Sequence, residues 1–150
     1  MDDAAIRAAL VRQFEDGRDL DATHELYHDD AVLEFPQSGE RFVGKASFLT
    51  WRRMYPAKVD YRLRRLTGHG ELWVIELLVS YSGAPPMFGV SIVRFRGDKI
   101  ARESIYAMEG FEPAAWRNEW VTPFDRLASV SPADWQDGAT FGIDIGSPAS

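Results

Sequence analysis

Residues 87–108 read MFGVSIVRFRGDKIARESIYAM, and the other predicted elements can be placed around this stretch. Valine, isoleucine, phenylalanine and tyrosine dominate both of its arms, and these side chains favour β-strands. The arms meet at Arg96-Gly97-Asp98-Lys99, where glycine and aspartate suit a tight turn. The stretch therefore predicts a long β-hairpin, which we expect to form the floor of a small-molecule pocket.

Two more strands are predicted just upstream of the hairpin. From residue 58 onward apolar and charged side chains alternate, so that Val59, Tyr61 and Leu63 share one face. The alternation slips by one residue at Arg65-Leu66, which indicates a β-bulge. Residues 71–81, ELWVIELLVSY, are largely apolar on both faces, and such a strand must be covered on both sides. We expect helices on one face and a second subunit, in a homodimer, on the convex face.

The N-terminal half predicts three helices and one short strand. Aspartates at positions 2, 3, 19 and 21 are candidate N-caps, and Pro56 disfavours helical geometry in the residue before it. We expect helices from the first aspartates to about residue 15, over 20–27 and over 45–55, with a turn at 29–30 before a strand at 31–35. This order predicts an α+β fold, a cone-shaped barrel whose curved antiparallel sheet wraps around three N-terminal helices.

Composition limits the possible functions. The 150 residues carry a net charge of −6, which argues against nucleic acid as a partner. The chain has no cysteine, so disulfides and cysteine-ligated metals are excluded. The N-terminal MDDAAIRAAL does not look like a signal peptide, and no apolar run approaches the ~18 residues of a membrane span. We expect a cytoplasmic protein that makes no contact with membranes.

Two segments carry a resemblance to a known family. Residues 19–48, DLDATHELYHDDAVLEFPQSGERFVGKASF, and residues 95–121, FRGDKIARESIYAMEGFEPAAWRNEWV, resemble the SnoaL-like branch of the nuclear transport factor two-like superfamily. The superfamily includes ketosteroid isomerase, polyketide cyclases, limonene epoxide hydrolase, scytalone dehydratase and many non-catalytic binding domains. The resemblance therefore implies a fold rather than one reaction.

The resemblance covers about residues 6–121, so we expect a SnoaL-like domain at 1–121 and a C-terminal extension at 122–150. A last helix is predicted at 113–120, with proline in its first turn. The extension is rich in proline, serine, aspartate and glycine, yet it carries large apolar residues such as Phe124, Leu127 and Trp135. A disordered segment would hold few of these. We expect the extension to pack on the domain or on a partner subunit.

The catalytic residues of these enzymes do not carry over. The resemblance aligns the aspartate base of ketosteroid isomerase with Phe35 and its oxyanion-hole tyrosine with Val11. The protonated aspartate of that enzyme corresponds to Ser91, and the strand aspartate of limonene epoxide hydrolase corresponds to Ile105. Carbon-acid proton transfer needs a base and a donor for the developing enolate. Neither enzyme's arrangement is therefore expected here.

Glu103 is the remaining candidate acid or base. Strand alternation leaves open which set of residues faces inward, and the resemblance places Glu103 and Ile105 on the concave face. A carboxylate in an apolar cone suits general acid–base catalysis. Alternatively, Glu103 could pair with an arginine at the sheet edge or point into solvent. Ser91 is the second candidate, because it could hydrogen-bond Glu103 or a ligand. The expected pocket wall is a set of large apolar residues: Phe14, Phe35, Trp51, Tyr55, Trp73, Leu77, Val93, Ile105 and, at the mouth, Trp116.

His24-Glu25-Leu26-Tyr27-His28 is a literal H-E-x-x-H motif. On a helix this spacing places both imidazoles on one face, where they can hold zinc with the glutamate as general base. The predicted helix is too short for this, and His69 has no ligand spacing. We therefore expect two partly solvated surface histidines, and no metal.

Our leading hypothesis is an enzyme that needs no cofactor and binds an apolar or aromatic small molecule. It would catalyse a cyclisation, isomerisation, dehydration (a lyase reaction) or hydrolysis, with Glu103 as acid or base. The alternative is a non-catalytic ligand-binding or dimerisation module, which the missing aspartates favour. A zinc hydrolase built on the histidine motif is the third hypothesis.

Overall fold

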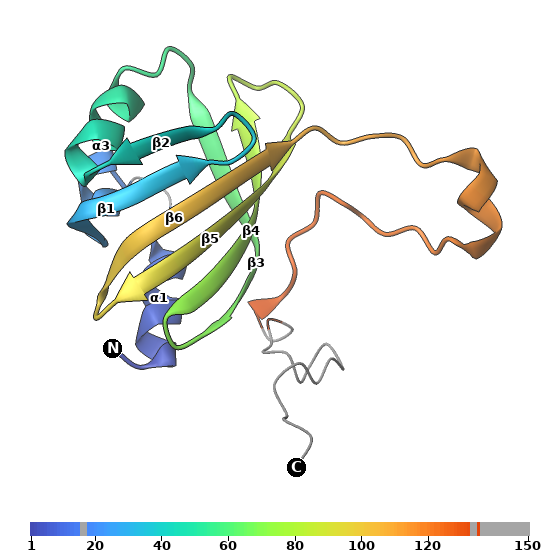
Figure 1. Cartoon of the computed structure of the whole chain (residues 1–150). Helices are drawn as coiled ribbons and strands as arrows, with labels where there is room; N and C mark the ends of the chain where they lie inside the picture. The colour runs from blue at the N-terminus through green and yellow to red at the C-terminus, as the bar shows by residue number, and fades with distance from the viewer. Residues whose placement is uncertain (16–17, 133–134, 136–150) are drawn as a thin grey trace.

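The computed structural model describes residues 1–15, 18–132 and 135, and its centre is one curved six-stranded sheet (Figure 1). The strands are β1 (Tyr27–Phe35), β2 (Glu40–Val43), β3 (Val59–His69), β4 (Leu72–Tyr81), β5 (Met87–Arg96) and β6 (Lys99–Met108). The helices are α1 (Asp3–Arg12), α2 (Leu20–His24), α3 (Lys45–Arg53) and the 3₁₀ helix η1 (Ala115–Trp120). The predicted α+β fold is confirmed.

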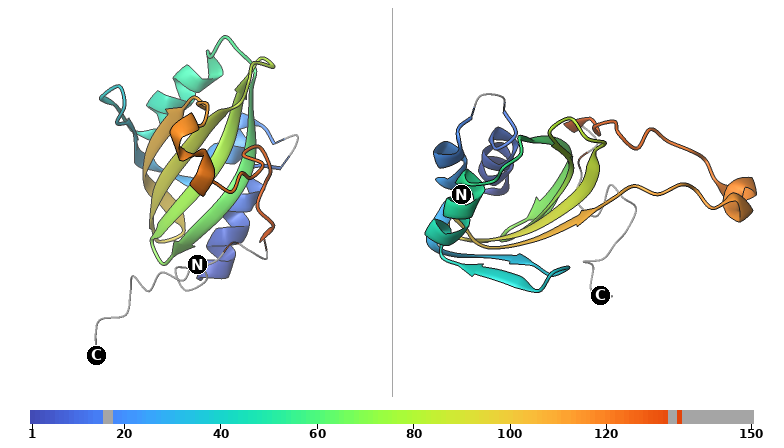
Figure 2. Two further views of the ribbon diagram at one scale, coloured as in Figure 1. Left: turned by 90° about the vertical axis from the view of Figure 1, so that its right-hand side faces the viewer. Right: turned by 90° about the horizontal axis from the view of Figure 1, so that it is seen from above.

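The sheet is curved but not closed, with the strand order β2-β1-β6-β5-β4-β3. β1 runs parallel to β6, and all other neighbouring strands are antiparallel. The three α-helices lie on the concave side of the sheet (Figure 2). This arrangement leaves a hollow between helices and sheet, while none of the α-helices in the described part of the chain covers the opposite, convex face.

The central hairpin forms as predicted. β5 and β6 pair from Phe88↔Met108 to Arg96↔Lys99, and Gly97 in the turn has a φ of 68°. Such a positive φ is strained for residues with a side chain, which explains the glycine. The predicted bulge in β3 is also confirmed, because the pairing with β4 shifts register between Leu63 and Arg65.

Some predicted bounds are wrong. α1 ends at Arg12, with Gln13 as its C-cap, and does not reach residue 15. α2 ends at His24, because Tyr27 already begins β1 and pairs with Ile100. Residues 29–30 therefore lie inside a strand rather than in a turn. The last predicted helix is a 3₁₀ helix without buried residues. For α2 and residues 29–30, strand pairing overrides the local helical pattern.

Two packed clusters hold the helices against the sheet. The larger joins Ile6 and Leu10 of α1 to Leu66, Trp73 and Val93 on the sheet. The smaller cluster is centred on Ala31 and Leu33 of β1 and Phe48 of α3. Both clusters sit on the concave side, so they fix the walls of the hollow.

The chain after η1 returns to the open edge of β3. The backbone N–H of Val130 donates to the carbonyl of Arg64 at 2.9 Å, and the Ser129 hydroxyl donates to the carbonyl of Leu63 at 3.0 Å. Trp135 is 7% exposed and packs in the larger cluster. Residues 133, 134 and 136–150 lie outside the described residues, so the division at residue 121 stays a prediction.

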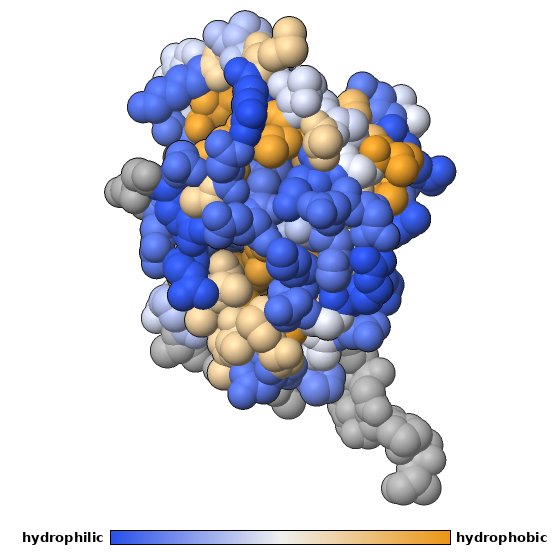
Figure 3. Space-filling view, turned by 90° about the vertical axis from the view of Figure 1, so that its left-hand side faces the viewer, coloured by the Kyte–Doolittle hydropathy of each residue, from blue (hydrophilic) through white to orange (hydrophobic). Residues whose placement is uncertain are grey.

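The outer face on the side of α3 and β1 is mostly hydrophilic, and its hydrophobic side chains form separate patches (Figure 3). None of the described helices is long and apolar enough to cross a membrane.

Candidate functional site

The hollow on the concave side is a cavity of about 990 Å³. That volume lies in the range of pockets for small molecules. Residues from all three α-helices and all six strands line the cavity, most of them aromatic or aliphatic. The five tyrosines of the chain all belong to its lining: Tyr27, Tyr55, Tyr61, Tyr81 and Tyr106.

Most of the predicted wall residues line this cavity: Phe14, Phe35, Trp51, Tyr55, Leu77, Val93 and Ile105. Two do not. Trp73 is fully buried beneath the wall, where its indole N–H donates to the carbonyl of Gly70 at 2.9 Å. Trp116 is 75% exposed on η1, which stands away from the cavity, so it does not close the mouth.

Glu103 and Ser91 lie together on the cavity floor. Glu103 is 6% exposed and Ser91 is 3% exposed, and both side chains line the cavity. The Ser91 hydroxyl donates to Oε2 of Glu103, and the Tyr27 hydroxyl donates to Oε1 at 2.5 Å. These two hydroxyls hold the carboxylate in one orientation. Glu103 is therefore neither in solvent nor in an ion pair at the sheet edge.

Arg52 reaches the same cavity from the last turn of α3. Its Nη1 lies 2.8 Å from Nε2 of His24. Nδ1 of His24 lies 2.7 Å from the carbonyl of Leu20, an arrangement that requires the Nδ1 proton. His24 is then neutral, and its Nε2 accepts a hydrogen bond from Arg52. The guanidinium also lies over the rings of Phe48 and Trp51, at 5.4 Å and 5.5 Å from their centroids.

Burial and charge shift the ionisation of these groups. Burial, together with the positive charge of Arg52, lowers the pKa of His24 to about 4. Burial and the charge of Glu103 raise the pKa of Tyr27, so its hydroxyl stays protonated. Burial opposes the charge on Arg52, yet its pKa is raised by Tyr27 and Glu103. At neutral pH His24 is thus uncharged, Tyr27 is protonated and Arg52 carries its positive charge.

The zinc interpretation of the H-E-x-x-H motif fails, and the expectation of two surface histidines is wrong for His24. The motif runs from the end of α2 into β1, so its histidines do not share a helix face. His24 is 4% exposed and faces the cavity, while Nε2 of His28 lies 2.6 Å from the carbonyl of Arg96. Among the described residues no group of three or more His, Cys, Asp or Glu side chains could hold a metal.

The pKa of His24 predicts a loss of stability in mild acid. Histidine in an unfolded chain titrates near 6.5, whereas His24 in the folded protein titrates at about 4. Because the folded pKa is lower, the stabilising contribution is complete above pH 6.5 and is lost as the pH falls towards 4. We expect the free energy of unfolding to drop by up to about 3 kcal/mol between pH 7 and pH 4. Urea denaturation at a series of pH values measures this drop.

Matched histidine variants identify the group responsible. His24→Gln should flatten the stability curve in this pH range, and His28→Gln should leave it unchanged. An equally steep curve for His24→Gln would assign the pH dependence to another group.

Sequence reasoning missed Tyr27, His24 and Arg52 as parts of the site. A signal for Arg52 was present, because it follows Phe48 by four residues and so shares the buried face of α3. Tyr27 and His24 lie where a helix ends and a strand begins. Neither the helical nor the strand periodicity of apolar residues therefore indicates which way their side chains point.

Comparison with known proteins identifies the family. Residues 8–103 match the family model of the SnoaL-like domain. A search of the curated proteins found no match. The solved structure of an NTF-2-like protein of unknown function from Burkholderia xenovorans LB400 is 37% identical, with a TM-score of 0.78, over 83% of this chain and 99% of its own.

Two more distant structures share the fold. A protein from Kribbella flavida DSM 17836, proposed to be a ketosteroid isomerase, is 22% identical, with a TM-score of 0.72, over 85% of this chain and 95% of its own. An LEH-like epoxide hydrolase of M. tuberculosis is 20% identical, with a TM-score of 0.57, over 71% of this chain and 84% of its own. At these identities only the fold is shared. With the family model matching well over half of its length, the chain belongs to the SnoaL-like domain family.

Proposed function

We propose that this protein is an acid–base enzyme that acts, without a cofactor, on a flat, largely apolar carbonyl compound in the concave cavity. Glu103 is the proposed proton acceptor, and Arg52 is the proposed partner of the negative charge that develops. The related structures named as an epoxide hydrolase and a proposed ketosteroid isomerase support the fold, not this reaction.

The observation that carries the proposal is the environment of Glu103. A carboxylate buried in an apolar cavity is unfavourable unless it is hydrogen-bonded or paired. Tyr27 and Ser91 supply the hydrogen bonds, and Arg52 lies close enough for its charge to act on Glu103. Buried ionisable groups, whose burial is energetically unfavourable, are concentrated at functional sites.

The proposed step is removal of a proton from the carbon next to the carbonyl group. The proton passes to Glu103, the C–H electron pair forms the enolate double bond, and the carbonyl oxygen takes the negative charge. Arg52 stabilises that oxygen. Return of the proton to another atom completes an isomerisation, loss of a leaving group completes a dehydration, and attack on a second carbonyl completes a cyclisation.

Carbon-proton exchange tests this step without knowledge of the natural substrate. The protein is incubated in D₂O with a panel of bicyclic aromatic ketones, and loss of the α-proton signal is followed by NMR. We expect at least one ketone to exchange faster than in buffer alone, and to raise the melting temperature. A panel that neither binds nor exchanges would contradict the proposal.

The second candidate is a ligand-binding module without catalysis. Its specific support is that both oxygens of Glu103 already accept hydrogen bonds from the protein, as in a purely structural carboxylate. Binding of a ketone, detected by the rise in melting temperature, with no exchange of its α-proton would favour this candidate.

A further inference from the structure

Three tyrosines gather at one end of the concave cavity, and they are here named the tyrosine rim. Tyr55 follows α3, Tyr61 lies on β3 and Tyr81 ends β4, and all three line the cavity. The rings of Tyr55 and Tyr81 are in contact, with their centroids 5.9 Å apart. Tyr61 and Tyr81 are diagonal neighbours, because Tyr61 pairs with Val79 and Val59 pairs with Tyr81. Three separate elements therefore bring their phenol groups to one place.

Exposure to solvent separates this rim from the cavity floor. Tyr55 is 43% exposed and Tyr61 is 56% exposed, whereas Ser91 and Glu103 on the floor are 3% and 6% exposed. Arg52 lies within electrostatic range of both Tyr61 and Glu103, so it links the two ends. A molecule that fills the cavity thus has one end buried at the floor and the other end at the half-exposed rim.

The hydroxyl groups of the rim are available to a ligand. Within the described part of the chain none of the three has a hydrogen-bond partner, whereas the hydroxyl of Tyr27 is bound to Glu103. Burial and the neighbouring Tyr55 raise the pKa of Tyr81, so its hydroxyl stays protonated at neutral pH. A phenol hydroxyl can donate one hydrogen bond and also accept. The rim therefore offers donors and acceptors without a charge.

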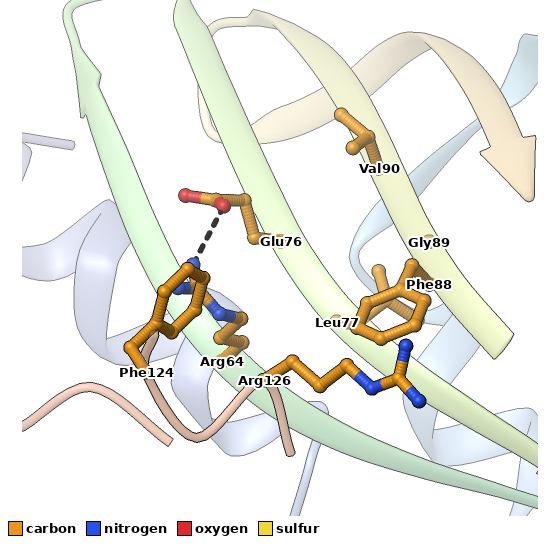
Figure 4. A pocket seen from close by; sticks show the side chains of 8 residues that line it. All are labelled: Arg64, Glu76, Leu77, Phe88, Gly89, Val90, Phe124 and Arg126. Carbon is orange, nitrogen blue, oxygen red and sulfur yellow. Dashed lines mark hydrogen bonds and ion pairs between the residues drawn. The ribbon is translucent and has the colours of Figure 1, made fainter. Parts of the chain in front are cut away.

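The convex face has a smaller groove, of about 250 Å³, whose polar groups are already engaged (Figure 4). Nη1 of Arg64 donates to Oε1 of Glu76 at 2.8 Å, and Nη1 of Arg126 donates to the carbonyl of Phe111 at 3.2 Å. The tyrosine rim differs from this groove because its three hydroxyls are not engaged. The rim is thus the better candidate for recognising a polar group of a ligand.

The charges around the cavity favour a neutral group at the rim. Glu40 also lines the cavity, with its carboxylate bound by the Ser38 hydroxyl at 2.6 Å, and it would repel an anion. Arg52, within electrostatic range of Tyr61, would repel a cation. An uncharged group that both donates and accepts hydrogen bonds, such as an alcohol hydroxyl, suits the rim best.

The spacing of the rim favours several hydroxyls rather than one. Diagonal neighbours on paired strands lie about 7–8 Å apart, so a single oxygen does not reach all three phenols. A sugar ring carries several hydroxyls around its edge and apolar C–H groups on its faces. Tyrosine suits both parts, because it combines an apolar ring with a polar tip.

We propose that the natural ligand is an O-glycoside of a flat carbonyl compound, with its ring system at the cavity floor and its sugar at the tyrosine rim. The carbonyl end rests on the proposed function, whereas binding of a sugar at the rim requires no catalysis. The cavity has room for both parts, because its volume of about 990 Å³ is at the upper end of the range for small-molecule pockets.

Four derivatives of 6-hydroxy-1-tetralone, a bicyclic aromatic ketone, test the substituent on a constant ring system. They are the β-D-glucoside, the neutral methyl ether, the anionic carboxymethyl ether and the cationic trimethylammonioethyl ether. Isothermal titration calorimetry measures their dissociation constants. We expect the glucoside to bind at least about 10-fold more tightly than the methyl ether, because its hydroxyls add hydrogen bonds at the rim. Neither charged ether should bind more tightly than the methyl ether.

Tyrosine-to-phenylalanine variants locate the sugar. Tyr55→Phe/Tyr61→Phe/Tyr81→Phe keeps the rings and removes the hydroxyls, so it should abolish the preference for the glucoside and leave the affinity for the methyl ether unchanged. Tyr106→Phe is the matched control, because Tyr106 also lines the cavity but lies on β6, two strands away from β4. It should keep the preference. Circular dichroism should show the same fold for all these proteins.

A glucoside that binds no more tightly than the methyl ether would overturn the proposal. A charged ether that binds more tightly than the glucoside, or a triple variant that keeps the preference, would overturn it as well. Deuterium exchange of the same ketones separates this result from the proposed function. Exchange of the methyl ether without a preference for the glucoside would retain the acid–base function alone. A rim-dependent preference without exchange would retain the glycoside and contradict the acid–base function.

Discussion

Glu103→Gln is expected to slow carbon-proton exchange by about 10²- to 10⁴-fold, the usual contribution of a positioned general base. Glutamine has nearly the same size, and its amide oxygen can still accept a hydrogen bond from Tyr27 or Ser91. It cannot accept the proton from carbon. The rate is measured by NMR in D₂O with the best ketone of the panel, and ligand binding should persist.

The matched control for this variant is Glu76→Gln. Glu76 is a carboxylate on β4 that pairs with Arg64 at 2.8 Å and lies in the groove of the convex face, away from the floor that holds Glu103. Its replacement should leave the exchange rate unchanged. Equal rates for Glu103→Gln and the wild type would remove Glu103 from the mechanism.

Arg52→Met is expected to have two effects. It should lower the exchange rate by about 10²- to 10³-fold, because the enolate oxygen loses its charged partner. It should also lower the free energy of unfolding by about 1 to 3 kcal/mol, because buried His24 loses its hydrogen-bond donor and Glu103 loses the nearby cation. Kinetics by NMR and urea denaturation measure the two effects separately.

The neighbouring arginine provides the control. Arg53 lies one residue further on α3, and its exposed side chain pairs with Asp21 at the surface. Arg53→Met should change stability by less than about 1 kcal/mol and leave exchange unaffected. The double variant Arg52→Met/Glu103→Gln should be more stable than Arg52→Met alone, because both charges are removed. No such recovery would show that the two charges are not coupled.

The structural elements that leave a pattern over many residues of the sequence, such as strand alternation, could be predicted. The hairpin, the bulge near Arg65 and the inward side of Ile105 follow from strand alternation, turn residues and a family resemblance. Helix ends were less predictable, because pairing of β1 with β6 draws Tyr27 into the sheet. Tyr27 pairs with Ile100, which lies 73 positions further along the chain, and pairing over such a distance leaves no recognisable pattern in the sequence around either residue.

The site itself was only half predictable. Glu103 and Ser91 share one hairpin, so their proximity follows from strand register. Tyr27 lies on β1, and the pairing of β1 with β6 brings its hydroxyl to the carboxylate. His24 and Arg52 meet only through the packing of α2 and α3. The histidine motif was misleading because its spacing has meaning only on a continuous helix.

A crystal structure with a bound enolate mimic tests the central claim most directly. A hydroxynaphthoquinone is suitable, because its ionised form is a planar enolate. We predict that the enolate oxygen lies within about 3.2 Å of the Arg52 guanidinium, with a ring carbon facing Glu103. A mimic bound outside the concave cavity, or inside it with no oxygen at Arg52, would contradict the account.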